Sequence, residues 1–199
     1  NRRHAHDKFD IPISNVRPAI SYGTQTAETA ADPRRETRFD CDYYFGVVAH
    51  RFCAQAVAGY PVTVYGKGEQ RKPFISLEDA VEGLAQVALV DPDDRPEGLT
   101  VYNQVTRAIS IVEIAETIAD VGDEFDLDVA VEHFENPRDE DETHKMEIEN
   151  ERYDDVIGGQ DQRFEEGMHD VFETLTAYAD TIETHEDRFL PGVLESSQD

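Results

Sequence analysis

The sequence predicts an α/β fold with short parallel strands, arranged like the second half of such a fold with a small mixed lobe attached. Two observations predict it. Short apolar runs typical of strands alternate with amphipathic runs typical of helices. The chain also has 199 residues, which is long enough for one domain with a substantial core.

The first forty residues are expected to form a helix, a strand and a long loop. Residues 1–10 have helical character, and the apolar run from Ile13 to Ile20 predicts a buried strand leading to Gly23. Pro18 lies near the end of this strand, where a missing ladder hydrogen bond is tolerated. Residues 24–40 are polar and rich in turn formers, and loops of this length in compact domains are often functional.

The next segment predicts two helices and two short strands. A helix is expected over residues 41–59, with Asp42 as its N-cap and Gly59 at its end. A short strand is expected at 61–66. The run at 74–90 starts as a strand and continues as a helix.

The following segment predicts a turn, a strand and a capped helix. Residues 91–98 form a surface turn, and residues 99–104 predict a buried strand. Ser110 is the expected N-cap of a helix over 111–122, and Glu113 completes a capping box.

The last third is more polar. Residues 128–134 predict a strand, whereas residues 135–160 show no clear periodicity. A long amphipathic helix is expected over 164–189, followed by a tail at 190–199.

The charge balance limits the classes of partner. Asp and Glu number 44 against 18 Lys and Arg, and the formal net charge is −26. The acids are spread along the chain, which predicts an acidic, hydrated surface suited to a very salty cytoplasm, where salt screens the self-repulsion. Because nucleic-acid binding needs basic stripes, we expect no nucleic-acid partner.

Cysteine content and hydropathy point to a reduced, cytoplasmic setting. Cys41 and Cys53 are too few for a disulfide framework, and we expect Cys53 to pack in the core. The chain contains no run of 18 apolar residues, so we expect no membrane-spanning helix. It starts at Asn1 within helical sequence, and we expect it to be part of a longer protein.

A basic turn lies in the stretch VYGKGEQRKPFISLED. Gly66 and Gly68 allow a tight backbone turn, and Arg71 and Lys72 follow it. Guanidinium and ammonium groups pair well with phosphate oxygens, so one interpretation is a phosphate site. The alternative is a hairpin-like surface turn with solvated charges.

A second candidate phosphate site contains Arg138, which lies among acids in NPRDEDETH, residues 136–144. Arg138 either contacts a phosphate or neutralises the neighbouring carboxylates. The seven histidines show no ligand spacing, and we predict no metal site. The sequence also contains neither a glycine-rich dinucleotide turn nor a Tyr-x-x-x-Lys pair, so we predict no catalytic residue in this chain.

Together these segments resemble a known family. RPAISYG, AVAGYPVTVYGKGEQRKPFISLEDAVEGL and LTVYNQ are similar to the C-terminal half of extended short-chain dehydrogenases, the NAD-dependent epimerase/dehydratase superfamily that acts on nucleotide sugars. TQTAET, RFDCDYYFG, HRFCAQA, VYNQVT and NPRDEDETH resemble, more narrowly, the UDP-sulfoquinovose synthase family.

The resemblance implies the C-terminal half of a doubly wound NAD-binding fold with a small mixed substrate-binding lobe, mainly residues 24–75 and 104–165. The N-terminal NAD-binding half is absent. The implied reaction joins sulfite to UDP-glucose to give UDP-sulfoquinovose, with NAD as cofactor. The alternatives are a UDP-sugar 4-epimerase or dehydratase, or a non-catalytic sugar-nucleotide-binding fragment. The complete enzyme is expected to be a homodimer.

The resemblance also implies phosphate contacts. The basic position that follows G-x-Q falls on Lys72, where the family has Arg, and Arg71 stands beside it. Arg138 matches the second arginine that contacts the phosphates. The resemblance therefore implies a diphosphate held by Lys72 or Arg71 together with Arg138.

Other positions match the rest of the nucleotide sugar. Gln104 matches a glutamine at the sugar-nucleotide cleft, and Val64 and Tyr65 fall on the strand whose backbone faces uracil. Phe45 and Gly46 match a segment that borders the nucleotide.

A third set corresponds to the stretch beside the nicotinamide of NAD: Arg17, Pro18, Ala19 and Ile20. The UDP-sulfoquinovose synthase family tends to have Asn-Gln where this chain has Arg17 and Pro18, which is the commoner pattern of the wider superfamily.

Overall fold

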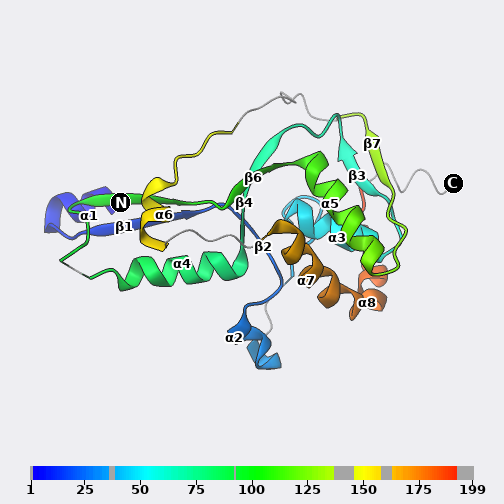
Figure 1. Cartoon of the computed structure of the whole chain (residues 1–199), viewed down its shortest axis with the longest axis horizontal. Helices are drawn as coiled ribbons and strands as arrows, with labels where there is room; N and C mark the ends of the chain where they lie inside the picture. The colour runs from blue at the N-terminus through cyan, green and yellow to red at the C-terminus, as the bar shows by residue number, and fades with distance from the viewer. Residues whose placement is uncertain (1, 36–38, 92, 137–145, 158–162, 192–199) are drawn as a thin grey trace.

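The computed structural model describes residues 2–35, 39–91, 93–136, 146–157 and 163–191. Figure 1 shows an elongated molecule with a cluster of helices at one end and a narrower part at the other. The elements in chain order are α1 (Arg2–Phe9), β1 (Ile13–Pro18), β2 (Ile20–Tyr22), α2 (Ala27–Ala30), η1 (Pro33–Arg35), α3 (Val48–Val57), β3 (Val62–Tyr65), β4 (Arg71–Ser76), α4 (Leu77–Leu89), β5 (Leu99–Gln104), β6 (Arg107–Ser110), α5 (Ile111–Glu124), β7 (Val131–Phe134), α6 (Glu151–Ile157), α7 (Phe164–Thr176), α8 (Ala179–Thr184) and η2 (Glu186–Arg188).

The described strands form three small sheets. β1 pairs with β5 in parallel, β3 pairs with β7 in parallel, and β2 pairs with β4 in parallel while β6 lies antiparallel to β4. The predicted α/β fold with short parallel strands is confirmed. Since β3 and β4 belong to different sheets, the glycine turn between them is not a hairpin.

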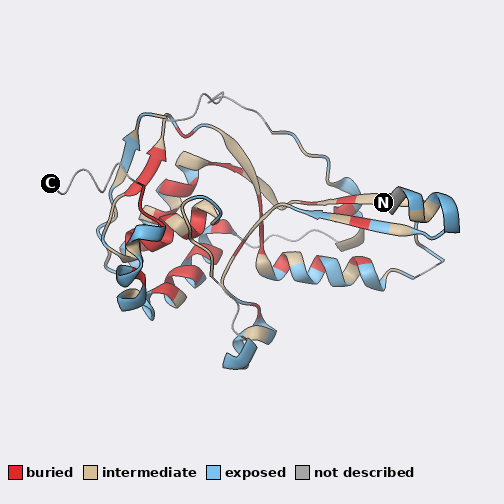
Figure 2. Cartoon of the chain, turned by 180° about the vertical axis from the view of Figure 1, so that it is seen from behind, coloured by how far each residue is buried: buried red, intermediate tan, exposed pale blue. Residues whose placement is uncertain are grey.

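The larger core lies where α3, α5 and α7 pack together, and Figure 2 shows buried residues concentrated there. The side chains of Phe52, Ile118 and Phe172 are fully buried in it. Cys53 is buried as expected, with its Sγ 3.9 Å from Sδ of Met168. Apolar burial of this extent is the main stabilising contribution to this end of the molecule.

A smaller core joins β5, α4 and α6 around Tyr153, at the narrow end of the molecule. Nε2 of Gln104 donates to the Tyr153 hydroxyl at 2.7 Å. A Cβ at Gly83 would lie 1.7 Å from the same hydroxyl, so only glycine lets α6 approach α4 this closely. α6 therefore packs away from the larger core, although it falls within the range 104–165 predicted for the substrate lobe.

Several predicted boundaries agree with the structure. α1 forms at the N-terminal end, and Gly59 follows α3 with a positive φ of 76°. Ser110 caps α5, and Glu113 completes the capping box. The run that starts as a strand and becomes a helix is confirmed, although β4 already begins at Arg71.

The helix predicted over 41–59 was wrong at its start. α3 begins at Val48, and its N-cap residue has no side-chain hydrogen bond. Asp42 caps a tight turn instead, because its Oδ1 accepts the backbone N–H groups of Tyr44 and Phe45 at 2.8 and 3.0 Å. This turn places residues 43–47 outside the helix.

The strand predicted over 13–20 was wrong in its extent and burial. It ends at Pro18, β2 starts at Ile20 in another sheet, and within β1 only Asn15 is buried. Within the described residues β1 pairs with β5 alone, so one of its edges is unpaired, while α4 packs against it and leaves it only partly buried.

Three other elements differ from prediction. The loop at 24–40 contains α2, which starts at a Thr26–Thr29 capping box and projects from the body in Figure 1. α6 forms in the stretch that shows no periodicity, because Tyr153 is held by tertiary contacts. The helix expected over 164–189 is interrupted at Ala177, so α7 and α8 are separate.

None of the described helices combines the length and the apolar character needed to cross a membrane.

Candidate functional site

A cavity of about 370 Å³, here called the Lys72 cavity, lies between β2, α3, β3, β4 and α5. The turn formed by residues 43–47 closes one side of it. Its lining residues are Ile20, Tyr43, Tyr44, Phe45, Gly46, Val47, Val48, Arg51, Thr63, Tyr65, Gln70, Lys72, Ile111 and Asn136. It therefore brings together four predicted substrate residues, Phe45, Gly46, Tyr65 and Lys72, and one predicted cofactor residue, Ile20.

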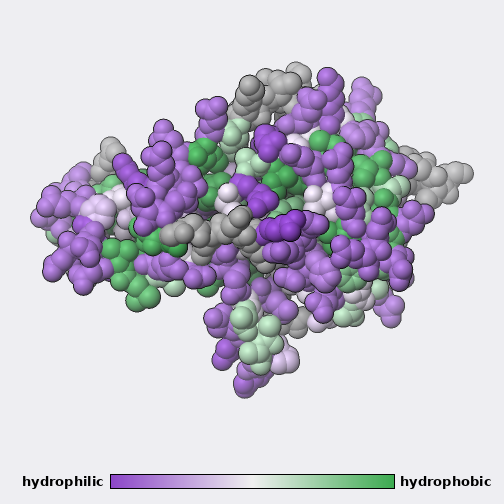
Figure 3. All heavy atoms as spheres, viewed as in Figure 1, coloured by the Kyte–Doolittle hydropathy of each residue, from purple (hydrophilic) through white to green (hydrophobic). Residues whose placement is uncertain are grey.

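The charge of the Lys72 cavity differs from that of the rest of the chain. Lys72 and Arg51 line it, and no Asp or Glu is among its described lining residues. The whole chain, in contrast, carries 44 acids, and Figure 3 shows hydrophilic residues covering most of the visible face. Lys72 and Arg51 give the described lining of this cavity a positive charge, which favours an anion there.

Aromatic side chains form much of the remaining wall. The hydroxyls of Tyr43 and Tyr65 are 2.9 Å apart, and the Arg51 guanidinium lies 5.2 Å from the centre of the Tyr43 ring. Tyr44 and Phe45 are 78% and 90% exposed at the rim. Exposed aromatic rings beside an anion site offer stacking surfaces to a planar group such as a nucleobase.

The 43–47 turn depends on Gly46. A Cβ at this position would lie 2.5 Å from the backbone nitrogen of Asp42, closer than real Cβ atoms approach. Gly46 N donates to Asp42 O at 2.8 Å, which closes the turn. The predicted site residue Gly46 is thus required by the shape of the cavity wall.

Arg71 and Lys72 lie on opposite sides of β4, as alternation along a strand requires. Arg71 Nη1 is 2.9 Å from Oε2 of Glu113, and Arg71 lines a separate cavity of about 610 Å³. The pKa of Glu113 is lowered, first by the Ser110 backbone N–H and further by Arg71. Of the two basic residues after the turn, only Lys72 lines the cavity named after it.

The remaining predicted substrate residues are placed differently. Val64 is buried in the core, while its neighbours Thr63 and Tyr65 line the cavity. Gln104 is buried outside the cavity, where its Nε2 donates to Ala80 O and to the Tyr153 hydroxyl. Arg138 lies outside the described residues, two positions after Asn136, which lines the cavity.

The predicted cofactor stretch lies at the carboxyl end of β1. Arg17 and Pro18 are exposed there, Ala19 N donates to Gln104 O at 2.8 Å, and Ile20 reaches the Lys72 cavity. Cofactors bind at the carboxyl ends of parallel strands, so this position fits a nicotinamide beside a substrate. The sequence contains no glycine-rich dinucleotide turn of the kind that follows a first strand, so its residues do not fit the pyrophosphate of the cofactor.

The sequence analysis missed Tyr43, Arg51 and Gln70. Arg51 follows Val48 by three residues on α3, so both lie on one face of the helix. This spacing could have indicated Arg51 as a cavity residue, but the predicted helix start at Asp42 did not identify which face of the helix lines the cavity.

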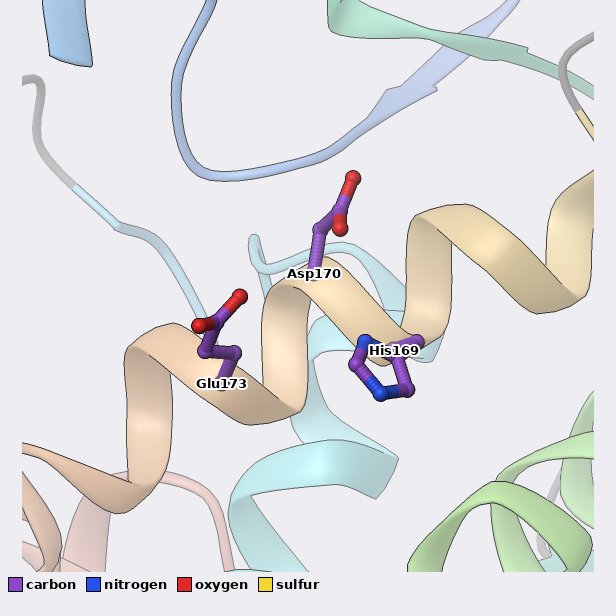
Figure 4. A group of neighbouring side chains, drawn as sticks. All are labelled: His169, Asp170 and Glu173. Atoms are coloured by element: carbon purple, nitrogen blue, oxygen red, sulfur yellow. The ribbon is translucent and has the colours of Figure 1, made fainter. Parts of the chain in front are cut away.

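His169, Asp170 and Glu173 form a group on α7 whose potential metal-ligand atoms lie within 4.8 Å of one another. All three are exposed, and Figure 4 shows the carboxylates directed to one side of the helix and the His169 ring turned to another. We assign no metal to this group, since exposed acidic clusters are common in so acidic a chain.

Comparison with known proteins identifies relatives, although no family model matches. UDP-sulfoquinovose synthase of Sulfolobus acidocaldarius is 33% identical over 188 residues, covering 94% of this chain and 47% of that protein. The chloroplastic UDP-sulfoquinovose synthase of Spinacia oleracea is 35% identical over 136 residues, covering 68% of this chain and 28% of that protein. The chain thus spans about half the length or less of these relatives.

Solved structures show the same fold. The epimerase Mth375 of Methanothermobacter thermautotrophicus superposes with a TM-score of 0.69 at 18% identity, covering 92% of this chain and 48% of that one. UDP-N-acetylglucosamine 4-epimerase of Methanobrevibacter ruminantium, in complex with UDP-N-acetylmuramic acid, gives 0.65 at 20% identity, covering 87% and 49%. Half of an epimerase-type α/β fold is therefore confirmed.

Proposed function

The chain belongs to the UDP-sulfoquinovose synthase family and matches the C-terminal part of its relatives, and from this premise we propose that it supplies the sugar-nucleotide-binding part of an NAD-dependent enzyme that modifies UDP-sugars. One observation carries the proposal. The Lys72 cavity has two cationic residues and no described carboxylate in a chain of net charge −26. Such a cavity favours a diphosphate over the neutral or cationic ligands that the rest of the surface attracts.

The parts of a UDP-sugar match the parts of the cavity. Lys72 would pair with the diphosphate, with Arg138 as the second phosphate contact by family resemblance. The rings of Tyr44 and Phe45 at the rim would cover the uracil. Tyr43, Tyr65 and Asn136 supply hydroxyl and amide groups that can hydrogen-bond ribose or hexose.

The finer proposal is synthesis of UDP-sulfoquinovose from UDP-glucose and sulfite. The reaction comprises oxidation at C4 of the sugar, elimination of the C6 hydroxyl as water across C5 and C6, addition of sulfite at C6 and reduction at C4. NAD, when bound, would supply the hydride chemistry at C4, and the reaction involves no net oxidation of the sugar. Support comes from the two synthases above and from the motif at residues 136–144.

In this proposal the described residues bind and orient the substrate. Ile20 at the start of β2 would separate the nicotinamide from the Lys72 cavity, and Lys72 would fix the diphosphate so that the hexose extends toward Ile20. The proton-transferring groups and the pyrophosphate site for NAD are assigned to no residue of this chain.

A second candidate is a UDP-sugar 4-epimerase or dehydratase. The Arg17-Pro18 pair favours it, since this is the commoner pattern of the wider superfamily, and the solved neighbours above include epimerases.

Sulfite dependence separates the two candidates. The complete protein is incubated with NAD and UDP-glucose in multimolar salt, with and without sulfite, and the products are analysed by mass spectrometry. A sulfonated UDP-hexose formed only with sulfite supports the synthase; UDP-galactose or a dehydrated sugar identifies the second candidate.

Binding by the cavity is tested separately by calorimetric titration of UDP into the purified chain. We expect Lys72→Ala to weaken UDP binding at least about tenfold, because a charge-assisted contact is worth roughly 1.5–3 kcal/mol. Lys67→Ala is the matched control, since Lys67 is an exposed lysine of the same turn that does not line the cavity. Equal loss in both variants, or in neither, would remove the Lys72 cavity from the proposal.

A further inference from the structure

His50 is a buried histidine that connects two distant segments. It lies on α3, it is 6% exposed, and its Nε2 is 3.0 Å from the backbone nitrogen of Gly23, which is 27 residues away in sequence. Because the amide donates its proton, Nε2 must be the acceptor, and the ring proton of the neutral imidazole is then on Nδ1. Gly23 has a φ of 121°, a conformation that favours glycine.

The surroundings of His50 keep it an acceptor. Burial lowers the pKa of the imidazole from 6.5 to about 4, and the Phe39 ring lies 4.5 Å from the His50 ring. Asp40 is the charged group that acts on His50, and its carboxylate and backbone oppose the shift without overcoming it. The imidazole therefore stays neutral at ordinary pH and continues to accept the Gly23 proton.

The His50–Gly23 bond joins two walls of the Lys72 cavity from behind. Gly23 directly follows β2, whose Ile20 lines the cavity, and His50 lies between Ala49 and Arg51 on α3, of which Val48 and Arg51 line the opposite wall. The hydroxyl of Thr24 lies 3.0 Å from the hydroxyl of Thr174, which ties the same segment to α7. The contact between Gly23 and His50 therefore links the segment after β2 to α3 without itself lining the cavity.

We propose that His50 is a positioning residue that, by accepting the Gly23 backbone proton, fixes β2 against α3 and so sets the fit of the Lys72 cavity for a nucleoside diphosphate. This inference rests on the proposed function, because the ligand is the one assigned there.

Two variants separate the acceptor from the packing. His50→Phe keeps a ring against Phe39 but removes the acceptor, whereas His50→Gln retains an amide oxygen that can accept the Gly23 proton. His185→Phe at the α8–η2 junction is the control, since it loses an exposed histidine that does not line the cavity. The probe is UDP, titrated calorimetrically at pH 7, and amide exchange of Gly23 is followed by NMR.

We expect His50→Phe to reduce the protection of the Gly23 amide about three- to tenfold, the range that the loss of one hydrogen bond gives. We also expect it to weaken UDP binding about threefold, with both effects largely restored in His50→Gln. In the unmodified chain, Gly23 protection should fall as the pH approaches about 4, and His50→Gln should not show this dependence.

The outcomes distinguish the two proposals. Unchanged Gly23 protection in His50→Phe overturns the inference whatever UDP does. Lost protection with unchanged UDP affinity overturns the positioning role but leaves the proposed function intact. Failure of the unmodified chain to bind UDP overturns both the proposed function and the positioning role.

Discussion

Two cavities of similar size in this chain have opposite electrostatic character. The Lys72 cavity is lined by Lys72 and Arg51 and by no described carboxylate. A cavity of about 350 Å³ beneath the 23–30 loop, here called the loop cavity, is lined by Glu78, Asp170 and Glu173 and by no described Lys or Arg. The same acidic composition surrounds both, so local placement rather than net charge decides which one can hold an anion.

Partial desolvation is the first cause of the pKa shifts in the loop cavity, and nearby carboxylates add to it. The pKa of Asp170, a residue whose side chain is still largely exposed, is raised first by this desolvation and further by the charges of Glu173 and Glu166. The pKa of Tyr22 is raised to about 12, mainly by burial and then by the charge of Asp79. In a chain of net charge −26, the positive charge of the described lining of the Lys72 cavity is therefore informative in itself.

The largest effect is expected when the charge of the Lys72 cavity is reversed. Lys72→Glu should weaken UDP binding by at least about a hundredfold, because it removes one charge-assisted contact and adds repulsion against the diphosphate. Lys67→Glu should change the affinity by less than about threefold, since exposed charges outside the cavity are screened. Calorimetric titration of both variants measures the difference, and equal effects would show that only net charge matters.

A comparable effect, on stability rather than on binding, is expected from acid titration of His50. Its folded-state pKa of about 4 lies below the unfolded value of 6.5, so the unfolded chain binds a proton first as the pH falls. Stability from this group is present above pH 6.5 and is lost progressively down to about pH 4, amounting to about 3 kcal/mol. Urea unfolding of the parent chain and of His50→Gln between pH 7 and 4 measures it. A parallel decline in both would assign the loss to carboxylates instead.

The smallest effect is expected in the loop cavity. Asp170 has a raised folded-state pKa, so its contribution is favourable below its unfolded pKa and is lost as the pH rises. Asp170→Asn should therefore stabilise the chain at pH 7 by no more than a few tenths of a kcal/mol after solvent screening, and should do nothing at pH 3. Thermal unfolding at both pH values checks this, and UDP affinity should be unchanged. A loss of UDP affinity would mean that the two cavities are not independent.

Much of the fold follows from local sequence. The capping box at Ser110 and Glu113 and the glycine after α3 are short-range signals, and both were predicted correctly. α6 was missed because Tyr153 is held by Gln104 and by the space beside Gly83, which are distant in sequence. The start of α3 was missed because Asp42 caps a turn as readily as a helix.

The site was predictable only where motif and strand geometry agree. Lys72 follows from the basic turn and Tyr65 from the family resemblance, and both line the cavity. Arg71 shares the motif, but the alternation of β4 turns it toward Glu113, a distinction that needs the register of the strand. Arg51 required the correct helix start, and the charge of the described cavity lining required the three-dimensional assembly of segments that are distant in sequence.

The central claim is that the Lys72 cavity binds the diphosphate of a UDP-sugar. The most direct measurement is a crystal structure of the chain grown with saturating UDP. The account predicts density for UDP in this cavity, with a phosphate oxygen within ion-pair distance of the Lys72 ammonium group and the uracil beside Tyr44 and Phe45. Density in another cavity, or an empty Lys72 cavity at saturating UDP, would contradict it.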